Sequence, residues 1–415
     1  LFIRPMYKES IMKKFLFLSL FPLFSIAENL QELLNLAEQN KQIEASKYSL
    51  ESTKEKEYST KSAYLPNLSL GANQTFNQEK NISTPEKSTT GSAKLVFTIY
   101  DGGKREASFE QQQALVKSAT FTLASIQNNI SLDVVYYYYN YLSTLASKES
   151  TLKKMEQLEA ERYRLEKFLS VGSITADELQ KIISSIEQTK VDLLTLDNTL
   201  NNISNTLEYL TGQEVSIEKG STIAYKDSTI EEGKRFDILA LEESVQSNKS
   251  EIQMAKSPNL PNIVLQNIYS IYDYDFPIET NTLDHQNSIQ LMMEWKIFDF
   301  ASTSSNVEAS YLKYLSKNSE LSYEKSKAKA SLKSAQNSYK TSLAKIDAAK
   351  AKLQASEMTY ELIKKKFQQG IVNNVSYLDA LTDKSNSYSQ LQTALNEVEY
   401  QKAVLLYQMG ENIKG

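Results

Sequence analysis

The chain has 415 residues but no cysteine, and it is poor in glycine and proline. The absence of cysteine excludes a disulfide framework, a thiolate metal site, a cysteine nucleophile and a lipid-modified N-terminal cysteine. Because only 11 Gly and 7 Pro can interrupt the chain, long unbroken elements are favoured. Hydrophobic residues make up 41%, which suits long thin helices or a solvated barrel better than one large compact core.

Several binding and catalytic chemistries are also missing. The formal net charge is −5, which argues against nucleic acid as a partner. The single histidine, His285, which we expect in an extracellular loop, cannot form a histidine cluster. No spacing is typical of a metal or cofactor site, and no nucleophile stands beside an acid–base pair. We therefore predict no catalytic residues, no cofactor and no metal, and we do not expect an enzyme.

An apolar run of 18 residues is lacking as well, so we expect no membrane-spanning helix. Residues 1–27 instead read as a leader and signal peptide. Met12-Lys13-Lys14 supplies the positive start, an apolar stretch runs from Phe15 to Phe24, and Ser25-Ile26-Ala27 offers a cleavage site of small residues. The mature chain is expected to begin near Glu28. Loss of four basic groups and one acidic group brings its formal charge to −8.

What the chain does contain is a pattern of lengths that occurs twice. A long polar run from Asp101 to Gly172 returns, with the same length, from Asp299 to Gly370. Gly212 and Gly410 follow these two runs at the same distance. Equal lengths are what two matched, rigid helical hairpins require. The period is too long for a solenoid, so we predict one structural unit used twice.

The predicted domains follow from this repeat. A first repeat covers 28–212, a linker or equatorial segment covers 213–234, and a second repeat covers 235–415. Each repeat should contain a helix, a β-hairpin and a long helical hairpin. In the first they are expected at 29–64, at about 65–100 and at 101–212, and in the second at 235–256, at about 260–298 and at 299–410, before a short tail. The first helix must stop at Pro66.

The predicted strands alternate between apolar and polar residues. In the clearest one, apolar side chains recur at every second position, at Ile289, Leu291, Met293, Trp295 and Ile297. One interpretation is a soluble antiparallel sheet packed on a core. The other is a transmembrane β-barrel, and strands of about 10 residues behind a signal peptide favour it. Four strands cannot close in lipid without leaving unpaired backbone groups, so several chains would have to share the barrel.

The long helices carry a heptad pattern. Past Gly172, positions three and four residues apart are apolar except for one threonine: Leu179, Ile182, Ile186, Thr189, Leu193, Leu196, Leu200, Ile203, Leu207 and Leu210. In the second unit Tyr360 and Phe367 belong to a run that recurs every seven residues. Each long arm would extend about 106 Å at 1.5 Å per residue. The apolar stripe is narrow, which favours a hollow tube of paired helices over a solid bundle.

Several short motifs resemble those of one known family in order and spacing. They are Tyr64-Leu65-Pro66-Asn67-Leu68, Ile99-Tyr100-Asp101-Gly102-Gly103, Trp295-Lys296-Ile297-Phe298-Asp299, Val171-Gly172-Ser173-Ile174, Tyr377-Leu378-Asp379-Ala380-Leu381 and Tyr407-Gln408-Met409-Gly410. Together with the leader, they make the chain similar to the TolC-like outer-membrane efflux family over essentially its whole mature length. The resemblance implies a mixed α and β fold in which a homotrimer shares a transmembrane β-barrel, continued by a periplasmic α-helical barrel.

The resemblance also implies a location and a function. The chain would lie in the outer membrane of a Gram-negative bacterium, in contact with its lipid, with a long periplasmic portion. It would be the passive exit duct of an efflux or type I secretion system, gated at its periplasmic entrance. Its partners would be a periplasmic adaptor (membrane fusion) protein and an inner-membrane pump. The alternative is a structural or adhesive coiled-coil protein of the cell surface, which explains the heptads but not the strands or the matched arms.

The resemblance places a gate near the tips of the long hairpins. Asp379, nine residues after Gly370, matches one family acid, whereas Ser376 stands where the family has a second. Glu178, six residues after Gly172, matches an acid in the closing contacts. Val372 replaces the family's arginine and Phe367 its tyrosine, so closure is expected to be mainly apolar. Alternatively, Asp379 is one more solvated helix charge.

The tips themselves resemble the family's adaptor-docking motif. The two copies comprise Val171, Gly172, Ser173 and Ile174 in the first hairpin, and Gln369, Gly370, Ile371 and Val372 in the second. The alternative is a plain turn between two helices that needs glycine for a positive φ. Both interpretations can hold together.

Overall fold

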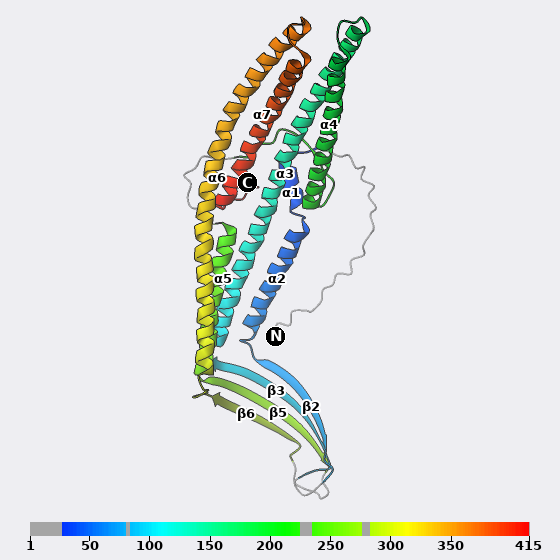
Figure 1. Ribbon diagram of the computed structural model, residues 1–415. Helices are drawn as coiled ribbons and strands as arrows, with labels where there is room; N and C mark the ends of the chain where they lie inside the picture. Colours follow the sequence, from blue (N-terminus) through cyan, green and yellow to red (C-terminus); the bar gives the residue numbers. More distant parts are fainter. Residues whose placement is uncertain (1–26, 80–83, 225–234, 276–282, 415) are drawn as a thin grey trace.

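The computed structural model describes residues 27–79, 84–224, 235–275 and 283–414, so almost all of the predicted leader lies outside it. The molecule is elongated, with a shaft of helices at one end and a curved sheet of four strands at the other (Figure 1). Two helices, α3 (Lys104–Ser170) and α6 (Ser302–Gln368), run the length of the shaft. Each has 67 residues, or about 100 Å.

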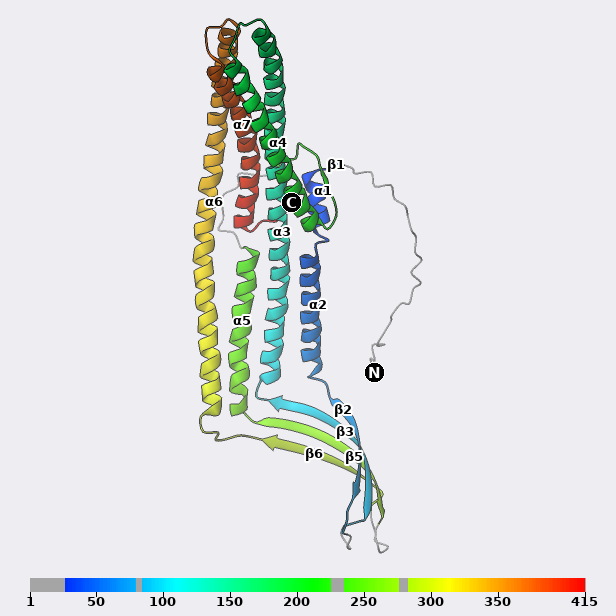
Figure 2. The same cartoon turned by 45° about the vertical axis from the view of Figure 1, so that its right-hand side comes forward.

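Two shorter helices turn back from the tips of the long ones. They are α4 (Ala176–Thr211) and α7 (Asn374–Met409), each of 36 residues, so the equal arms predicted from the sequence are present. Beside the sheet-proximal halves of α3 and α6 lie α2 (Lys41–Ser62) and α5 (Phe236–Lys256) (Figure 2). The predicted heptad stripe of α4 is turned inward, with Ile182, Ile186, Leu200, Ile203, Leu207 and Leu210 buried.

The sheet is antiparallel throughout, in the order β2-β3-β5-β6. Its strands are β2 (Asn67–Phe76), β3 (Lys87–Asp101), β5 (Asn262–Asp275) and β6 (His285–Glu294). Apolar side chains such as Leu70, 81% exposed, lie on one face of the sheet. No helix of the described chain covers the sheet (Figure 1). Within the described residues, β2 and β6 each pair with one strand only and form the two open edges of the sheet.

Three sequence-based predictions were wrong in detail. The helix expected over 29–64 is two helices, α1 (Leu30–Ala37) and α2, because Asn40 caps α2 through Gln42 N and donates to the carbonyl of Leu210. His285 begins β6 instead of lying in a loop. The last strand ends at Glu294, before Trp295 and Ile297, because Glu294 faces Asn262, where β5 starts.

Within the predicted linker 213–234, a short strand, β4 (Ser216–Ile217), pairs in parallel with β1 (Ala27–Glu28). The neighbouring segment is fixed to the shaft by tyrosines of α3. Tyr138 donates to the carbonyl of Glu218 and Tyr139 to that of Ser221. A ten-residue part of the linker, 225–234, lies outside the described residues.

The two long helices start in the same unusual way. Before α3, Gly102 and Gly103 have φ of +70° and +78°, the left-handed region that suits glycine. Before α6, the same region is occupied by Phe300 at +51° and Ala301 at +68°. The carboxylates of Asp101 and Asp299 accept from the N–H groups of Arg105 and Thr303, the second residue of each helix, in equivalent contacts. The second junction therefore holds two non-glycine residues in a strained conformation.

Because of this strain, we expect Ala301→Gly to stabilise the folded protein by about 0.5–1 kcal/mol, after allowing for the greater freedom of glycine in the unfolded chain. The matched control is Gly103→Ala. A Cβ there would meet no atom within 4 Å, so its expected destabilisation is purely conformational. Thermal unfolding followed by circular dichroism measures both changes. A lower melting temperature for Ala301→Gly would show that the junction is not strained.

Candidate functional site

The tips of both helical hairpins are built by the same turn. In the first, Gly172 N donates to the carbonyl of Leu169 and Ser173 N to that of Phe168. In the second, Gly370 N donates to Phe367 and Ile371 N to Lys366. This is the Schellman pattern, which needs a left-handed residue, and the two glycines have φ of +72° and +74°. Glycine is thus required locally in both turns.

The turns also expose a surface at the end of the shaft. Val171 and Ile371 are 72% and 65% exposed. A Cβ placed on Gly172 or Gly370 would meet no atom within 4 Å, so the space beyond both glycines is open. Ile174 and Val372, by contrast, pack partly into the protein. Each tip therefore presents an apolar residue next to bare backbone.

Just behind the tips, the two hairpins pack against each other. We call this group the inter-hairpin cluster; its buried members are Leu158, Leu165, Ile182 and Ile186 from α3 and α4, and Tyr360, Phe367, Tyr377, Ala380 and Leu381 from α6 and α7. The Phe367 ring stacks on that of Tyr377, with centroids 4.9 Å apart. Burial raises the pKa of the Tyr377 hydroxyl well above its ordinary value, so this ring stays neutral.

Polar contacts join the hairpins across this cluster. The Tyr360 hydroxyl donates to Gln157 Oε1 at 2.6 Å, and Asn374 Nδ2 donates to the carbonyl of Glu178 at 2.9 Å. The other amide atom, Asn374 Oδ1, is buried and accepts no hydrogen bond from the described part of the chain. Both bonds connect residues about 200 positions apart in the sequence, and both would break if the hairpins separated.

One cation of the first hairpin also reaches the second. The Arg164 guanidinium lies 4.9 Å from the centroid of the Phe367 ring, a cation–π contact. It is held there by Glu161, which accepts from Arg164 Nη2 at 2.6 Å. Burial raises the pKa of the Glu161 carboxyl, and the pairing with Arg164 opposes that rise. A charged side chain thus takes part in an interface expected to be mainly apolar.

The predicted gate residues occupy different surroundings. Phe367 and Val372 contribute to the inter-hairpin cluster, and Glu178 contributes its backbone carbonyl. Ser376 is used in capping α7, where its N–H and hydroxyl both bond to Asn373 Oδ1. The carboxylate of Asp379 is exposed to solvent. The sequence analysis missed Arg164, Gln157 and Asn374, whose roles depend on which helix lies opposite.

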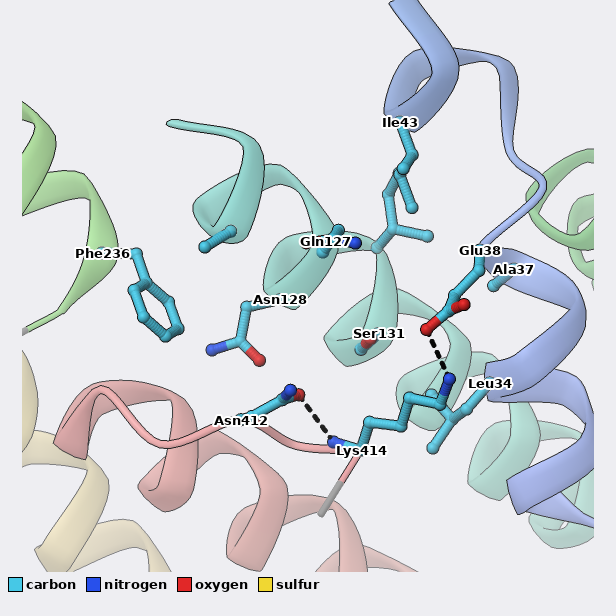
Figure 3. Close-up of a pocket in the computed structure, with 12 residues that line it drawn as sticks. Leu34, Ala37, Glu38, Ile43, Gln127, Asn128, Ser131, Phe236, Asn412 and Lys414 are labelled. Carbon is cyan, nitrogen blue, oxygen red and sulfur yellow. Dashed lines mark hydrogen bonds and ion pairs between the residues drawn. The ribbon is translucent and has the colours of Figure 1, made fainter. Parts of the chain in front are cut away.

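A small cavity lies at mid-height, away from the tips. It lies between α1, α3 and the C-terminal segment, bordered by the ion pair of Glu38 and Lys414 (Figure 3). On its border, Asn128 holds the C-terminal segment by donating to the carbonyl of Glu411 and accepting from Ile413 N. These contacts are structural. Within the described ranges no three His, Cys, Asp or Glu side chains come together as metal ligands.

In the part of the chain that the structure describes, no helix is both long and apolar enough to cross a membrane.

Comparison with known proteins gives consistent matches. The family model described as Outer membrane efflux protein matches residues 33–213 and 231–409. Outer membrane protein TolC of Salmonella enteritidis is 22% identical over 407 residues, which cover 91% of this chain and 81% of that protein. Among solved structures, the Campylobacter jejuni CmeC outer membrane channel aligns with a TM-score of 0.84 at 16% identity, over 92% of this chain and 86% of that one. The outer membrane protein VceC of Vibrio cholerae aligns with a TM-score of 0.83 at 15% identity, over 92% of this chain and 96% of that one.

Proposed function

Because this chain belongs to the outer membrane efflux protein family, and is an outer-membrane exit duct of an efflux system in a Gram-negative bacterium, we propose that three copies assemble into one channel. The observation that carries the proposal is the sheet with two open edges. An open edge in lipid leaves unpaired N–H and C=O groups, each of which costs several kcal/mol. Three sheets joined edge to edge in a closed barrel leave no such groups.

Each copy contributes a duplicated unit, with repeats at 28–212 and 235–415 around the segment 213–234. The long hairpins of three copies form a tube that continues the barrel through the periplasm. A solute then moves through water instead of lipid, so transport needs no catalytic step and no cofactor. The energy comes from an inner-membrane pump, which is coupled to the tube through a periplasmic adaptor.

Assembly is tested by fractionating cells and running outer-membrane proteins on SDS gels with and without heating. We expect trimer bands that convert to monomer on boiling, and water-filled pores in planar bilayers. A structural or adhesive coiled-coil protein, the alternative, would give no pores. A purified monomer that stays soluble without detergent would contradict the assembly proposal.

The inter-hairpin cluster, in this proposal, holds the periplasmic entrance closed. The Tyr360–Gln157 bond, the Asn374–Glu178 bond and the Arg164–Phe367 contact each join one hairpin to the other, so they exist only while the two hairpins lie together. These contacts would close the entrance, as an arginine at the position of Val372 does in other members of the family. Asp379, one per copy, would add a ring of three carboxylates that attracts cations.

We expect Asp379→Asn to lower the cation selectivity of the pore in bilayer recordings and to weaken its block by divalent cations. The physical reason is that three converging carboxylates in a narrow mouth concentrate cations. The matched control is Glu361→Gln, which removes one exposed carboxylate from α6 near the same end of the shaft. If both variants keep the selectivity of the unmodified channel, Asp379 is an ordinary solvated charge.

A further inference from the structure

A cavity of about 230 Å³ lies between the two hairpins, bounded by residues of α3, α6 and α7. It adjoins the inter-hairpin cluster, because Leu381 belongs to both. Its volume is many times what one water molecule needs. Three lysines line it, Lys153 and Lys154 on α3 and Lys384 on α7, and so does one acidic residue, Glu357 on α6. The formal charge of the lining is therefore +2, three positive charges less one negative.

The three lysines have no anionic partner in the described part of the chain. No carboxylate oxygen there lies within 4.0 Å of any of their Nζ atoms. Two of them lie over aromatic rings. Lys384 Nζ is 4.4 Å from the centroid of the Tyr360 ring, and Lys153 Nζ is 5.7 Å from that of Tyr388. These contacts hold the two ammonium groups in place without neutralising them.

The third lysine, Lys154, is half-buried. Burial lowers the pKa of its ammonium group, an effect that the charge of Asp192 opposes. A charge removed from water costs free energy unless an opposite charge pairs with it. Lys148, earlier on the same helix, has such a partner in Asp197, at 2.5 Å. For Lys154 an anion in the cavity would supply the missing partner.

Uncharged donors complete the lining of the cavity. Gln157 Oε1 accepts from the Tyr360 hydroxyl, which leaves Gln157 Nε2 as a donor with no acceptor among the described residues. Ser150 and Ser385 also line the cavity, and their hydroxyl oxygens lie 3.0 Å apart. Ammonium, amide and hydroxyl groups are donors that suit the oxygens of phosphate and sulfate.

We propose that this cavity binds a small oxyanion with two negative charges, of the phosphate or sulfate type. The anion pairs with Lys153 and Lys154 of one hairpin and with Lys384 of the other, so it bridges the two. The site is complete only while the hairpins lie together, and binding therefore favours that arrangement. Its effect on transport rests on the proposed function of the inter-hairpin cluster: the bound anion helps to keep the periplasmic entrance closed.

Binding is measured by equilibrium dialysis of radiolabelled inorganic phosphate against the detergent-solubilised channel, with ionic strength held constant by chloride. We expect Lys154→Gln and Lys384→Gln each to weaken phosphate binding about ten-fold, because each removes a charge-assisted hydrogen bond. Lys154→Arg keeps the charge and should keep most of the affinity. Glu357→Gln removes the negative charge of the lining and should tighten binding roughly three-fold.

Two matched controls remove the same kinds of charge outside the cavity. Lys340→Gln changes an exposed lysine of α6, and Glu361→Gln changes an exposed carboxylate one turn beyond Glu357. Each should alter phosphate binding by less than about two-fold, since water and salt screen these charges. Phosphate binding that is absent from the unmodified channel, or equal in all the variants, would overturn the site.

Single-channel recording tests the consequence for gating separately. We expect phosphate, but not chloride, to lower the open probability of the unmodified channel, and Lys154→Gln to remove this effect. An equal response of Lys154→Gln to phosphate would mean that the anion acts elsewhere, against the proposal. If phosphate binds as expected but leaves the open probability unchanged, the site is supported and the proposed role of the inter-hairpin cluster in closure is contradicted.

Discussion

Tyr360→Ala is expected to hold the periplasmic entrance open, raising the conductance of the purified channel and the entry of large hydrophilic antibiotics into cells. Tyr360 is 1% exposed and is the residue of the inter-hairpin cluster that both packs and hydrogen-bonds across it. Its ring lies among Tyr377, Lys384 and Lys364, and its hydroxyl reaches Gln157 on the other hairpin. Removing this side chain takes away a buried member of the inter-hairpin cluster together with its bond to the other hairpin.

The expected size of the effect of Tyr360→Ala on the ratio of open to closed states follows from the loss of buried volume. Truncating a buried aromatic residue to alanine costs about 3–5 kcal/mol. If most of that contact is lost when the hairpins part, the cost falls on the closed state. A bias of about 3 kcal/mol changes the ratio of open to closed states by a factor of roughly 100. Single-channel recording of the open probability measures this directly.

Two variants separate gating from general damage. Tyr360→Phe keeps the packing and removes only the bond to Gln157, so a shift of about 1 kcal/mol, or five-fold, is expected. Tyr138→Ala empties an equally buried site at mid-height, where the ring bonds to Glu218, and should lower stability without opening the entrance. If Tyr138→Ala opens the channel as much as Tyr360→Ala, the inter-hairpin cluster is not the gate.

Part of the proposed gate could be predicted from the sequence. Tyr360 and Phe367 recur at a heptad spacing, and such a spacing predicts that both residues face a partner helix. It does not say which helix, because the stripe of α6 is the same whichever helix packs on it. The Arg164–Phe367 contact could not be foreseen for that reason. Nothing in the sequence distinguishes Arg164 from its neighbour Arg162, which pairs with Glu159 and Glu166. Only the packing of the two hairpins against each other places Arg164 over the Phe367 ring.

The fold was easier to predict than the gate because its signals are local. Pro66 and Pro261 lie just past the ends of α2 and α5 and immediately before strands. Alternation marks the strands, and left-handed glycines end α3, α4, α6 and α7. Local signals failed where the structure depends on a distant partner. The capping contact of Asn40 needs the end of α4, and the length of β6 depends on what strand lies beside it.

Replacing both tip glycines by tryptophan is expected to abolish docking of the periplasmic adaptor and to leave the trimer intact. The space beyond Gly172 and Gly370 is open, so an indole group fits on the free molecule without a clash. It would, however, project beside Val171 and Ile371, the apolar residues that each tip exposes. We expect crosslinking from the tips to the adaptor, identified by mass spectrometry, to fall at least ten-fold. Export through the channel in cells should fall to the level of a deletion strain.

Backbone strain has to be separated from bulk, because any side chain at a φ near +70° costs about 1–2 kcal/mol. Gly172→Ala with Gly370→Ala introduces that strain with a single methyl group at each tip. Gly212→Trp introduces strain and bulk together at a left-handed residue remote from the tips. Docking lost only with tryptophan at the tips means that the adaptor covers bare backbone there. Docking lost already with alanine means that the turn conformation is what it recognises, and docking kept in all variants removes the tips from the interface.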